Sequence, residues 1–294
     1  MKWSLAVVLA LFAGSAVAQE AAGEEAAAEA QEAPAPQLTF KRGEVLLPGG
    51  QARLDVPESF GYLDPAQTEQ VLVSWGNPPG SETLGMLLPS GVSPDADESY
   101  GVVITYADDG HVDDEDAKET DYAELLEQMQ QSTDEENSAR EEAGYAPVKL
   151  VGWATAPHYD SDAKKIYWAK ELKFGAASAN TLNYSVRVLG KEGVLELNAV
   201  SAMGQLTQVE QGMQQVLAFT DFQPGHRYAD FDPGTGRLAG YGIAGLVAGK
   251  VAAKAGFFKV ILGALLAAKK LVGVAVVALI AFVSKLFKGK QQEG

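Results

Sequence analysis

The sequence predicts an α+β fold, in which a single domain built on an antiparallel β-sheet is packed by two or more helices. A C-terminal membrane helix is expected to follow this domain. Three observations lead to the prediction: strand-like runs joined by short links, two segments with helical spacing, and an apolar, lysine-bearing C-terminal end. The domain is placed at residues 38–236, which is enough chain to bury one good core.

The run "TLNYSVRVL", residues 181–189, carries the clearest strand pattern. Its apolar side chains alternate with Thr, Asn, Ser and Arg, which predicts a sheet with one wet face. The short Gly-bounded stretch "GKEG" (190–193) leads into a second run at 194–202, as in a β-hairpin. Four further runs are expected to be strands: 71–75, 101–106, 148–154 and 166–174.

Two segments have helical spacing. In the first, 121–143, Asp121 is a suitable N-cap because Glu124 follows three residues later. The second runs from about residue 206 to 219 and has an apolar stripe. Its members are Leu206, Val209, Met213, Val216 and Leu217. The order of strands and helices resembles the PsbP-like α/β/α sandwich.

The N-terminal 18 residues are typical of a secretory signal peptide. Lys2 precedes an apolar run, and Ala16-Val17-Ala18 is a small-residue cleavage site. Residues 19–37 are rich in Ala, Glu and Pro without apolar periodicity, so we expect a disordered acidic tether. The chain contains no cysteine, which excludes disulfides, thiolate metal sites and lipidation at a cysteine.

Charge divides the chain into an acidic body and a basic tail. Residues 237–294 hold nine Lys or Arg and one acid, which leaves 14 basic and 38 acidic residues in the preceding part. Nucleic acid is excluded as a partner of the body, because phosphate binding needs clustered cations. The tail is apolar as well as basic, which favours the lipid bilayer.

The tail is divided into a Gly/Ala/Lys-rich juxtamembrane helix (237–256), a membrane-anchoring segment (257–287) and a cytoplasmic tail (288–294). The last apolar run, 271–284, covers roughly 21 Å as a helix, less than a hydrocarbon core of about 30 Å. Two arrangements stay open: a single crossing by residues 271–287, or a tilted span or re-entrant hairpin that shields Lys269 and Lys270. With a signal peptide, the domain is expected in the periplasm at the bacterial inner membrane. The spacing Gly245-x-x-x-Gly249 suggests a homo-oligomer through this Gly-rich segment.

The segment "ADDGHVDDEDA", residues 107–117, places six carboxylates and His111 in nine positions. It does not fit an EF-hand, because the positions before Gly110 lack the alternating acids. Two interpretations remain. One is an irregular Ca²⁺ site, with these candidate metal ligands: Asp108, Asp109, Asp113 and Asp116. The other, which we favour, is a hydrated turn whose acids precede the positive end of a helix.

The stretch "SWGNPPG" is the second candidate site. Two prolines stiffen it and Trp75 stands at its base, so a partner could bind there. A structural corner is the alternative. The candidate partner-binding residues are Trp75, Asn77, Pro78 and Pro79. No catalytic residue is nominated, because the sequence has no nucleophile elbow, P-loop, dinucleotide fingerprint or paired-histidine motif.

Several long motifs together resemble a bacterial family called domain of unknown function 2167, whose members are described as uncharacterised membrane-anchored proteins. The motifs, in chain order, are "VLVSWGNPPG", "DGHVDDEDA", "LVGWATAPHYD", "IYWAKELKF", "TLNYSVRVLGKEGVLELN" and "YADFDPGTGRLAGYGIAGLVAGK". The resemblance covers roughly residues 40–290 and implies export and a C-terminal anchor. It implies no reaction and no catalytic residues.

Together these observations predict a non-enzymatic cell-envelope protein that binds or scaffolds other envelope components. The alternative is a divalent-ion-dependent enzyme or sensor that uses the acidic residues 108–116. Calorimetry with Ca²⁺, Mg²⁺, Mn²⁺ and Zn²⁺ on the domain would discriminate between the two hypotheses, because the ion site requires heat of binding that is lost in Asp113→Asn.

Overall fold

The computed structural model describes residues 38–249 except 76, 78, 95, 97, 98 and 143. The compact unit ends at Val247. The predicted signal peptide, the tether and the anchoring segment 257–287 lie outside the described residues. Within the described part, no helix is both long and apolar enough to cross a membrane.

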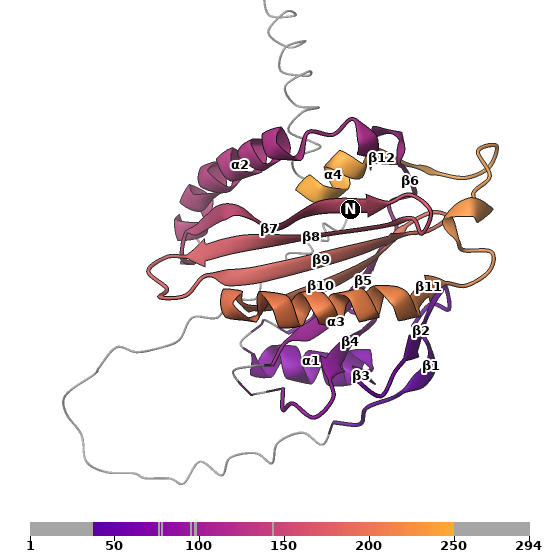
Figure 1. The fold of residues 1–294 in the computed structure, drawn as a ribbon, viewed down its shortest axis with the longest axis horizontal. Coiled ribbons are helices and arrows are strands. Elements are labelled where there is room, and N and C mark those ends of the chain that lie inside the picture. Colours follow the sequence, from indigo (N-terminus) through magenta and orange to yellow (C-terminus); the bar gives the residue numbers. More distant parts are fainter. Residues whose placement is uncertain are drawn as a thin grey trace, which may run out of the picture. The chain divides into compact units, whose positions relative to one another are not determined.

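A seven-stranded antiparallel sheet forms the centre of the domain (Figure 1). Its spatial order is β3-β4-β5-β10-β9-β8-β7. The strands are β3 Phe60–Leu63, β4 Gly85–Pro89, β5 Gly101–Ala107, β7 Val148–Asp160, β8 Lys165–Phe174, β9 Thr181–Leu189 and β10 Val194–Ala202. Because β7 to β10 follow one another in both sequence and space, short hairpins suffice to connect them.

Two smaller sheets flank the large one. β1 Gly43–Leu46, β2 Ala52–Val56 and β11 Thr220–Phe222 form an antiparallel three-stranded sheet in the order β1-β2-β11. β6 His111–Asp113 and β12 Leu238–Gly242 pair in parallel. The β6–β12 pair therefore joins the acidic segment to the end of the described chain.

In the described part of the chain, four α-helices cover the sheets: α1 Pro65–Ser74, α2 Tyr122–Glu142, α3 Leu206–Phe219 and α4 Ile243–Ala248. Three short 3₁₀ turns accompany them: η1 Glu115–Lys118, η2 Met203–Gln205 and η3 Tyr228–Asp230. In Figure 1, α3 lies along one side of the large sheet, and α2 and α4 lie beyond β7 and β8. The domain is thus a layered α+β fold with an antiparallel sheet, as predicted.

The face of the sheet toward α3 is apolar on its middle strands. Leu182, Tyr184, Val186 and Val188 of β9 and Leu195, Leu197 and Ala199 of β10 belong to one buried cluster. The cluster also takes in the buried stripe of α3 and the inner residues of β1 and β2. Gly212 allows α3 to approach closely, because a Cβ there would collide with the Tyr100 side chain.

The opposite face carries two separate apolar clusters. One joins α1 to β4 and β5 through Val71, Leu72, Met86 and Val103. The other joins α4 to β8 and to the edge of β10. Its main members are Ile166, Trp168, Val194, Ile243, Leu246 and Val247. Polar side chains of the central strands lie on this face outside both clusters.

Residues 71–75 are not a strand, and that prediction is wrong. The chain there belongs to α1, which starts after Asp64: the Asp64 side chain accepts a hydrogen bond from the Gln67 N–H at 3.0 Å, and proline occupies the first turn. This N-cap and N-terminal proline outweigh the β-branched run, whose Val71 and Leu72 are buried against β4 and β5.

The domain also extends beyond the predicted boundary at residue 236. The expected juxtamembrane helix 237–256 begins instead as β12, and α4 ends at Ala248. Gly249 has a positive φ of 82°, so Gly245 and Gly249 do not share one continuous helix. The predicted strands at 101–106, 166–174, 181–189 and 194–202 and both predicted helices are present. The strand predicted at 148–154 continues to Asp160 and so includes His158.

Candidate functional site: an acidic clamp and a polar strip

The acidic segment forms a clamp on the part of the chain that follows β11. Four of its carboxylates, Asp108, Asp109, Asp114 and Asp116, each hold a different point of residues 228–244. We call these four residues the acidic clamp. Asp108 pairs with Arg237, and Asp109 accepts a hydrogen bond from the Tyr241 hydroxyl at 2.6 Å.

Asp114 is the most heavily bonded member of the clamp. Its carboxylate accepts hydrogen bonds from the hydroxyls of Tyr159 and Tyr228 and from the Lys164 ammonium at 2.7 Å. Burial alone would raise the pKa of Asp114, but these three donors outweigh it and hold the pKa below its usual 3.8. The same contacts and burial raise the pKa of the Tyr228 hydroxyl.

Asp116 caps the start of α4. Its two oxygens accept hydrogen bonds from the Ile243 N–H at 2.8 Å and the Ala244 N–H at 3.1 Å. Gly242 leaves room for this contact, since a Cβ there would lie 2.6 Å from the Asp116 carboxylate. The negative charge therefore satisfies two N–H groups that have no partner within the helix.

The candidate ion ligands are not brought together. Asp108, Asp109 and Asp116 bond to different residues, and Asp113 accepts a hydrogen bond from the Glu115 N–H at 2.8 Å in a local turn. Among the described residues, no group of three or more His, Asp or Glu side chains is placed to hold a metal ion. The geometry therefore supports the structural use of these carboxylates.

His111 reinforces the clamp. Its ring is stacked on Phe231 at 3.9 Å between centroids and lies 4.1 Å from the Tyr228 ring. Its Nδ1 is 3.0 Å from the Lys191 carbonyl oxygen. The ring is buried against aromatic neighbours, so it fixes the position of residues 228–231 rather than facing an open site.

A second feature is a row of polar side chains on the sheet face opposite α3. We call this row the polar strip, and its members are Thr105, Lys170, Asn183, Ser185, Arg187, Glu196 and Asn198. The register places Glu196 opposite both Thr105 and Arg187, and Asn198 opposite Ser185. The members other than Ser185 are partly exposed, although they lie on the middle strands of the sheet.

The strip holds one ion pair and one cation without a partner. Arg187 Nε lies 3.6 Å from Glu196 Oε1, and an Arg187 terminal nitrogen donates to Asn198 Oδ1 at 3.1 Å. Glu196 also accepts a hydrogen bond from the Thr105 hydroxyl at 3.3 Å. The Lys170 side chain, in contrast, has no hydrogen bond or ion pair with any described residue. Burial and the charge of Arg187 lower the pKa of Lys170 to about 8.

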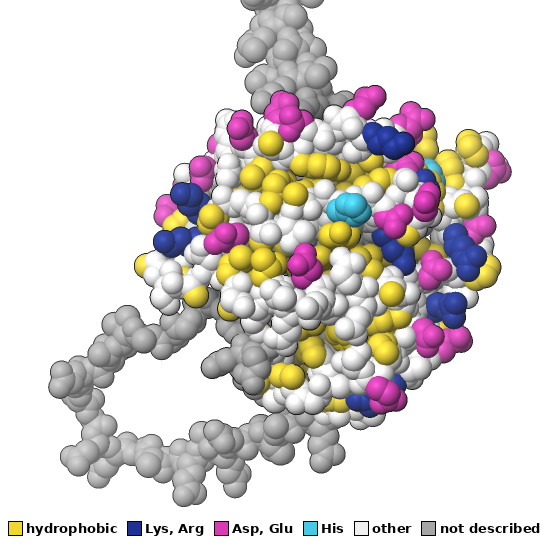
Figure 2. Space-filling model, viewed as in Figure 1, with side chains coloured by type: hydrophobic (Ala, Val, Ile, Leu, Met, Phe, Trp, Pro, Cys, Tyr) yellow, Lys and Arg dark blue, Asp and Glu magenta, His cyan; other side chains and the backbone are white. Residues whose placement is uncertain are grey.

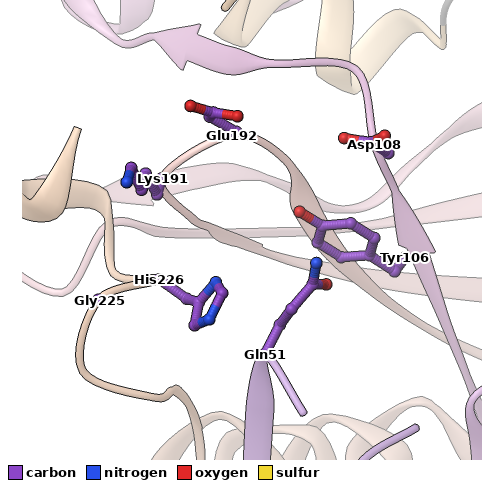
Figure 3. Close-up of a pocket in the computed structure, with 7 residues that line it drawn as sticks. All are labelled: Gln51, Tyr106, Asp108, Lys191, Glu192, Gly225 and His226. Atoms are coloured by element: carbon purple, nitrogen blue, oxygen red, sulfur yellow. The ribbon is translucent and has the colours of Figure 1, made fainter. Parts of the chain in front are cut away.

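A small hollow lies at one end of the sheet. Its volume is about 190 Å³, and its lining residues are Gln51, Tyr106, Asp108, Lys191, Glu192, Gly225 and His226. Figure 3 shows the side chains of Gln51, Tyr106 and His226 pointing toward a common space from three parts of the chain. The hollow is polar and bears both signs of charge, and its Asp108 is already paired with Arg237.

The stiff corner after α1 serves the domain itself. Trp75 packs against the apolar cluster of α1 and donates from its indole nitrogen to the Pro94 carbonyl oxygen at 3.2 Å. Asn77 bonds to the Leu72 carbonyl oxygen through both its backbone N–H and its side chain. Pro79 is exposed, and Pro78 lies outside the described residues. The contacts of Trp75 and Asn77 are those of a structural corner.

The chain belongs to the family described as "Protein of unknown function (DUF2167)", whose model matches residues 39–280. This match confirms the resemblance seen in the sequence motifs. No curated protein matches the sequence. The family covers the whole described domain, including the clamp and the polar strip.

The fold is similar to those of two solved proteins. Cyanobacterial PsbP from Synechocystis sp. PCC 6803 has 9% identity and a TM-score of 0.34, with 61% of this chain and 91% of that chain covered. The Ran-binding protein Mog1p of Saccharomyces cerevisiae has 12% identity and a TM-score of 0.36, with 66% and 100% covered. Likeness at this level carries no argument about function.

Proposed function

We propose that the protein is a non-enzymatic binding module of the bacterial cell envelope, held at the inner membrane by its C-terminal segment with the domain in the periplasm. The observation that carries the proposal is the acidic clamp. Four carboxylates hold residues 228–244, and those residues lead to the lysine-bearing apolar tail.

The surface agrees with a role in binding rather than with an enclosed reaction site. Figure 2 shows Asp and Glu side chains spread over the visible face of the domain, with fewer Lys and Arg. The hollow of Figure 3 is small and polar, and its Asp108 is already paired with Arg237. A periplasmic location and unknown envelope partners remain part of the proposal.

Cell fractionation tests the proposal. The full chain is compared with a chain that ends after Gly249, and with a matched chain in which only the apolar run 271–284 is replaced by a polar linker. The full chain is expected in the membrane pellet after an alkaline wash, and both variants in the periplasmic extract. Recovery of the full chain in the soluble fraction without detergent would contradict the proposal.

A topology reporter at the C-terminus separates the two tail arrangements. A single crossing places the reporter in the cytoplasm, whereas a re-entrant hairpin leaves it on the periplasmic side with the domain. An active periplasmic reporter on a membrane-bound chain would remove the cytoplasmic tail 288–294 from the proposal. It would leave the membrane attachment unchanged.

A further inference from the structure

We infer that the polar strip binds the oxyanion group of a small ligand, a carboxylate or a phosphate, between Lys170 and Arg187. The inference deepens the proposed function and rests on it in one respect, because it names the ligand class of the binding module. Three observations support the inference: the strip has more positive than negative charges, two buried donors there make no hydrogen bond to a described residue, and the sheet register places Lys170 on the same face as Arg187.

The charges in the strip do not balance. Its two cations face a single carboxylate, Glu196, and Glu196 is already engaged by Arg187 and by the Thr105 hydroxyl. Among the described residues, Lys170 is thus left as an uncompensated positive charge, in a chain whose net charge is −16. A cation surrounded by protein without a counter-charge is costly, so an anion that approached it would be bound favourably.

Two buried nitrogen donors at the strip make no hydrogen bond to a described residue. Arg187 Nε and the indole nitrogen of Trp168 are buried and make no hydrogen bond within the part of the chain that the structure describes. The Arg187 guanidinium lies over the Trp168 ring at 5.1 Å, which brings these two donors to one place. Unsatisfied buried donors are rare in folded proteins, and one explanation for them is a ligand that accepts their hydrogens.

The register places Lys170 on the same face as Arg187, but four residues along β8 from Ile166, which stands opposite Arg187. The Arg187 side chain shortens this interval, because it reaches Asn198, which stands opposite Ser185. Lys170 stands opposite Asn183 on β9, and two residues away on each strand Trp168 stands opposite Ser185. Lys170 and Arg187 are close enough that the charge of Arg187 lowers the pKa of Lys170. Guanidinium and ammonium groups together suit an oxyanion, because the guanidinium donates in a fork and the ammonium supplies a compact charge.

The state of Lys170 reports directly on anion binding. The full chain is purified in detergent micelles, its lysines are ¹³C-dimethylated, and the signal of Lys170 is assigned by its loss in Lys170→Met. Its pH titration is recorded with sodium phosphate, with sodium acetate, and with sodium chloride at matched ionic strength. A bound anion stabilises the ammonium, so phosphate or acetate is expected to raise the pKa of Lys170 by about 1 relative to chloride.

The two anions distinguish the source of the oxyanion, since a shift with phosphate alone assigns a phosphate group and a shift with acetate alone a carboxylate. Lys173, exposed on the same strand, is the matched control, and its signal is expected to be the same in all three salts. Equal titration of Lys170 in phosphate, acetate and chloride would overturn the inference.

A second measurement, of the melting temperature, shows whether the result could come from a distorted variant. Phosphate or acetate is expected to raise the melting temperature of the wild-type chain more than that of Lys170→Met, with Lys173→Met behaving as wild type. Equal effects on all three chains would contradict the inference. Both measurements use purified protein, so they stand or fall independently of fractionation, which tests the membrane location in the proposed function.

Discussion

The two faces of the large sheet are built on different principles. The face toward α3 is one continuous apolar cluster, in which Tyr184, Val186, Leu197 and Ala199 have no exposed area. The opposite face has one apolar cluster under α1 on β4 and β5, and a second cluster that joins α4 to β5, β8, β9 and β10. The polar strip continues along the same strands as this second cluster. One face therefore supplies the stability of the domain, and the other gives up part of that stability to keep charged groups in place.

The difference between the two faces indicates that the polar face is the one that carries the function. Polar groups on middle strands cost free energy unless each is bonded. Among the described residues, the Lys170 ammonium has no counter-charge, and Arg187 Nε and Trp168 Nε1 make no hydrogen bond, although Arg187 Nε is ion-paired with Glu196. Folding alone would favour apolar residues at such positions. Their presence is explained by a ligand, and the predictions below test this contrast.

The largest effect is expected from two neighbours on β10 that point to opposite faces. Leu197→Ala should lower the free energy of unfolding by about 3 kcal/mol, because it opens a cavity in the dry face. Asn198→Ala should cost about 1 kcal/mol, because water can replace its hydrogen bonds on the partly exposed strip. Chemical denaturation measures both, and equal losses would remove the distinction between the faces.

Lys170→Met is expected to stabilise the protein by about 2 kcal/mol near neutral pH. The substitution keeps the side-chain length and removes an uncompensated charge. The folded pKa of about 8 lies below the ordinary 10.5, so the cost of Lys170 is fully present below pH 8 and disappears as the pH rises toward 10.5. The advantage of the variant should shrink over that range. A destabilised variant would show that Lys170 is structural.

A smaller effect is expected at the clamp. Asp116→Ala should cost about 1 kcal/mol and should increase hydrogen exchange at Ile243 and Ala244, because their N–H groups lose the cap. Asp113→Ala is the matched control, since the exposed side chain of Asp113 bonds to the Glu115 N–H within its own turn and not to α4. Faster exchange of α4 in both variants would argue against a cap by Asp116.

The smallest effect is expected in the unfolding free energy at low pH. The pKa of Asp114 is lower in the folded protein than its ordinary 3.8, so its contribution to stability is complete above pH 3.8 and is lost as the pH falls through the folded value. The difference in unfolding free energy between wild type and Asp114→Asn should therefore narrow as the pH drops below 3.8. A difference that stays constant in acid would contradict the bonding described for Asp114.

The sequence predicted the local features of the fold well. The hairpin of 181–189 and 194–202 matches β9 and β10 at both ends, because alternation and a short loop are local signals. The wet face was predicted from Asn183, Ser185 and Arg187. The error at 71–75 came from weighing a β-branched run above the cap and proline at Asp64-Pro65, which carried the helix signal.

The two sites could not be assembled from the sequence, because their residues are distant along the chain. Asp116 meets Ile243 across 127 residues, and no local pattern pairs a turn carboxylate with that helix start. The membership of Lys170 and Glu196 in the strip depends on the register of β8 and β10 with β9, which is set by the folded sheet. The acidic segment was therefore noticed for its charge, but its partners were missed.

The most direct test of the account is the titration of Lys170 in the full chain without added phosphate or acetate. The account holds that the polar face of the sheet keeps a positive charge without a counter-ion from the protein. It predicts that the ¹³C-methyl signal of Lys170 titrates near pH 8. A titration near 10.5 would mean that Lys170 is solvated or paired. The polar face would then hold no uncompensated charge, and the account would be contradicted.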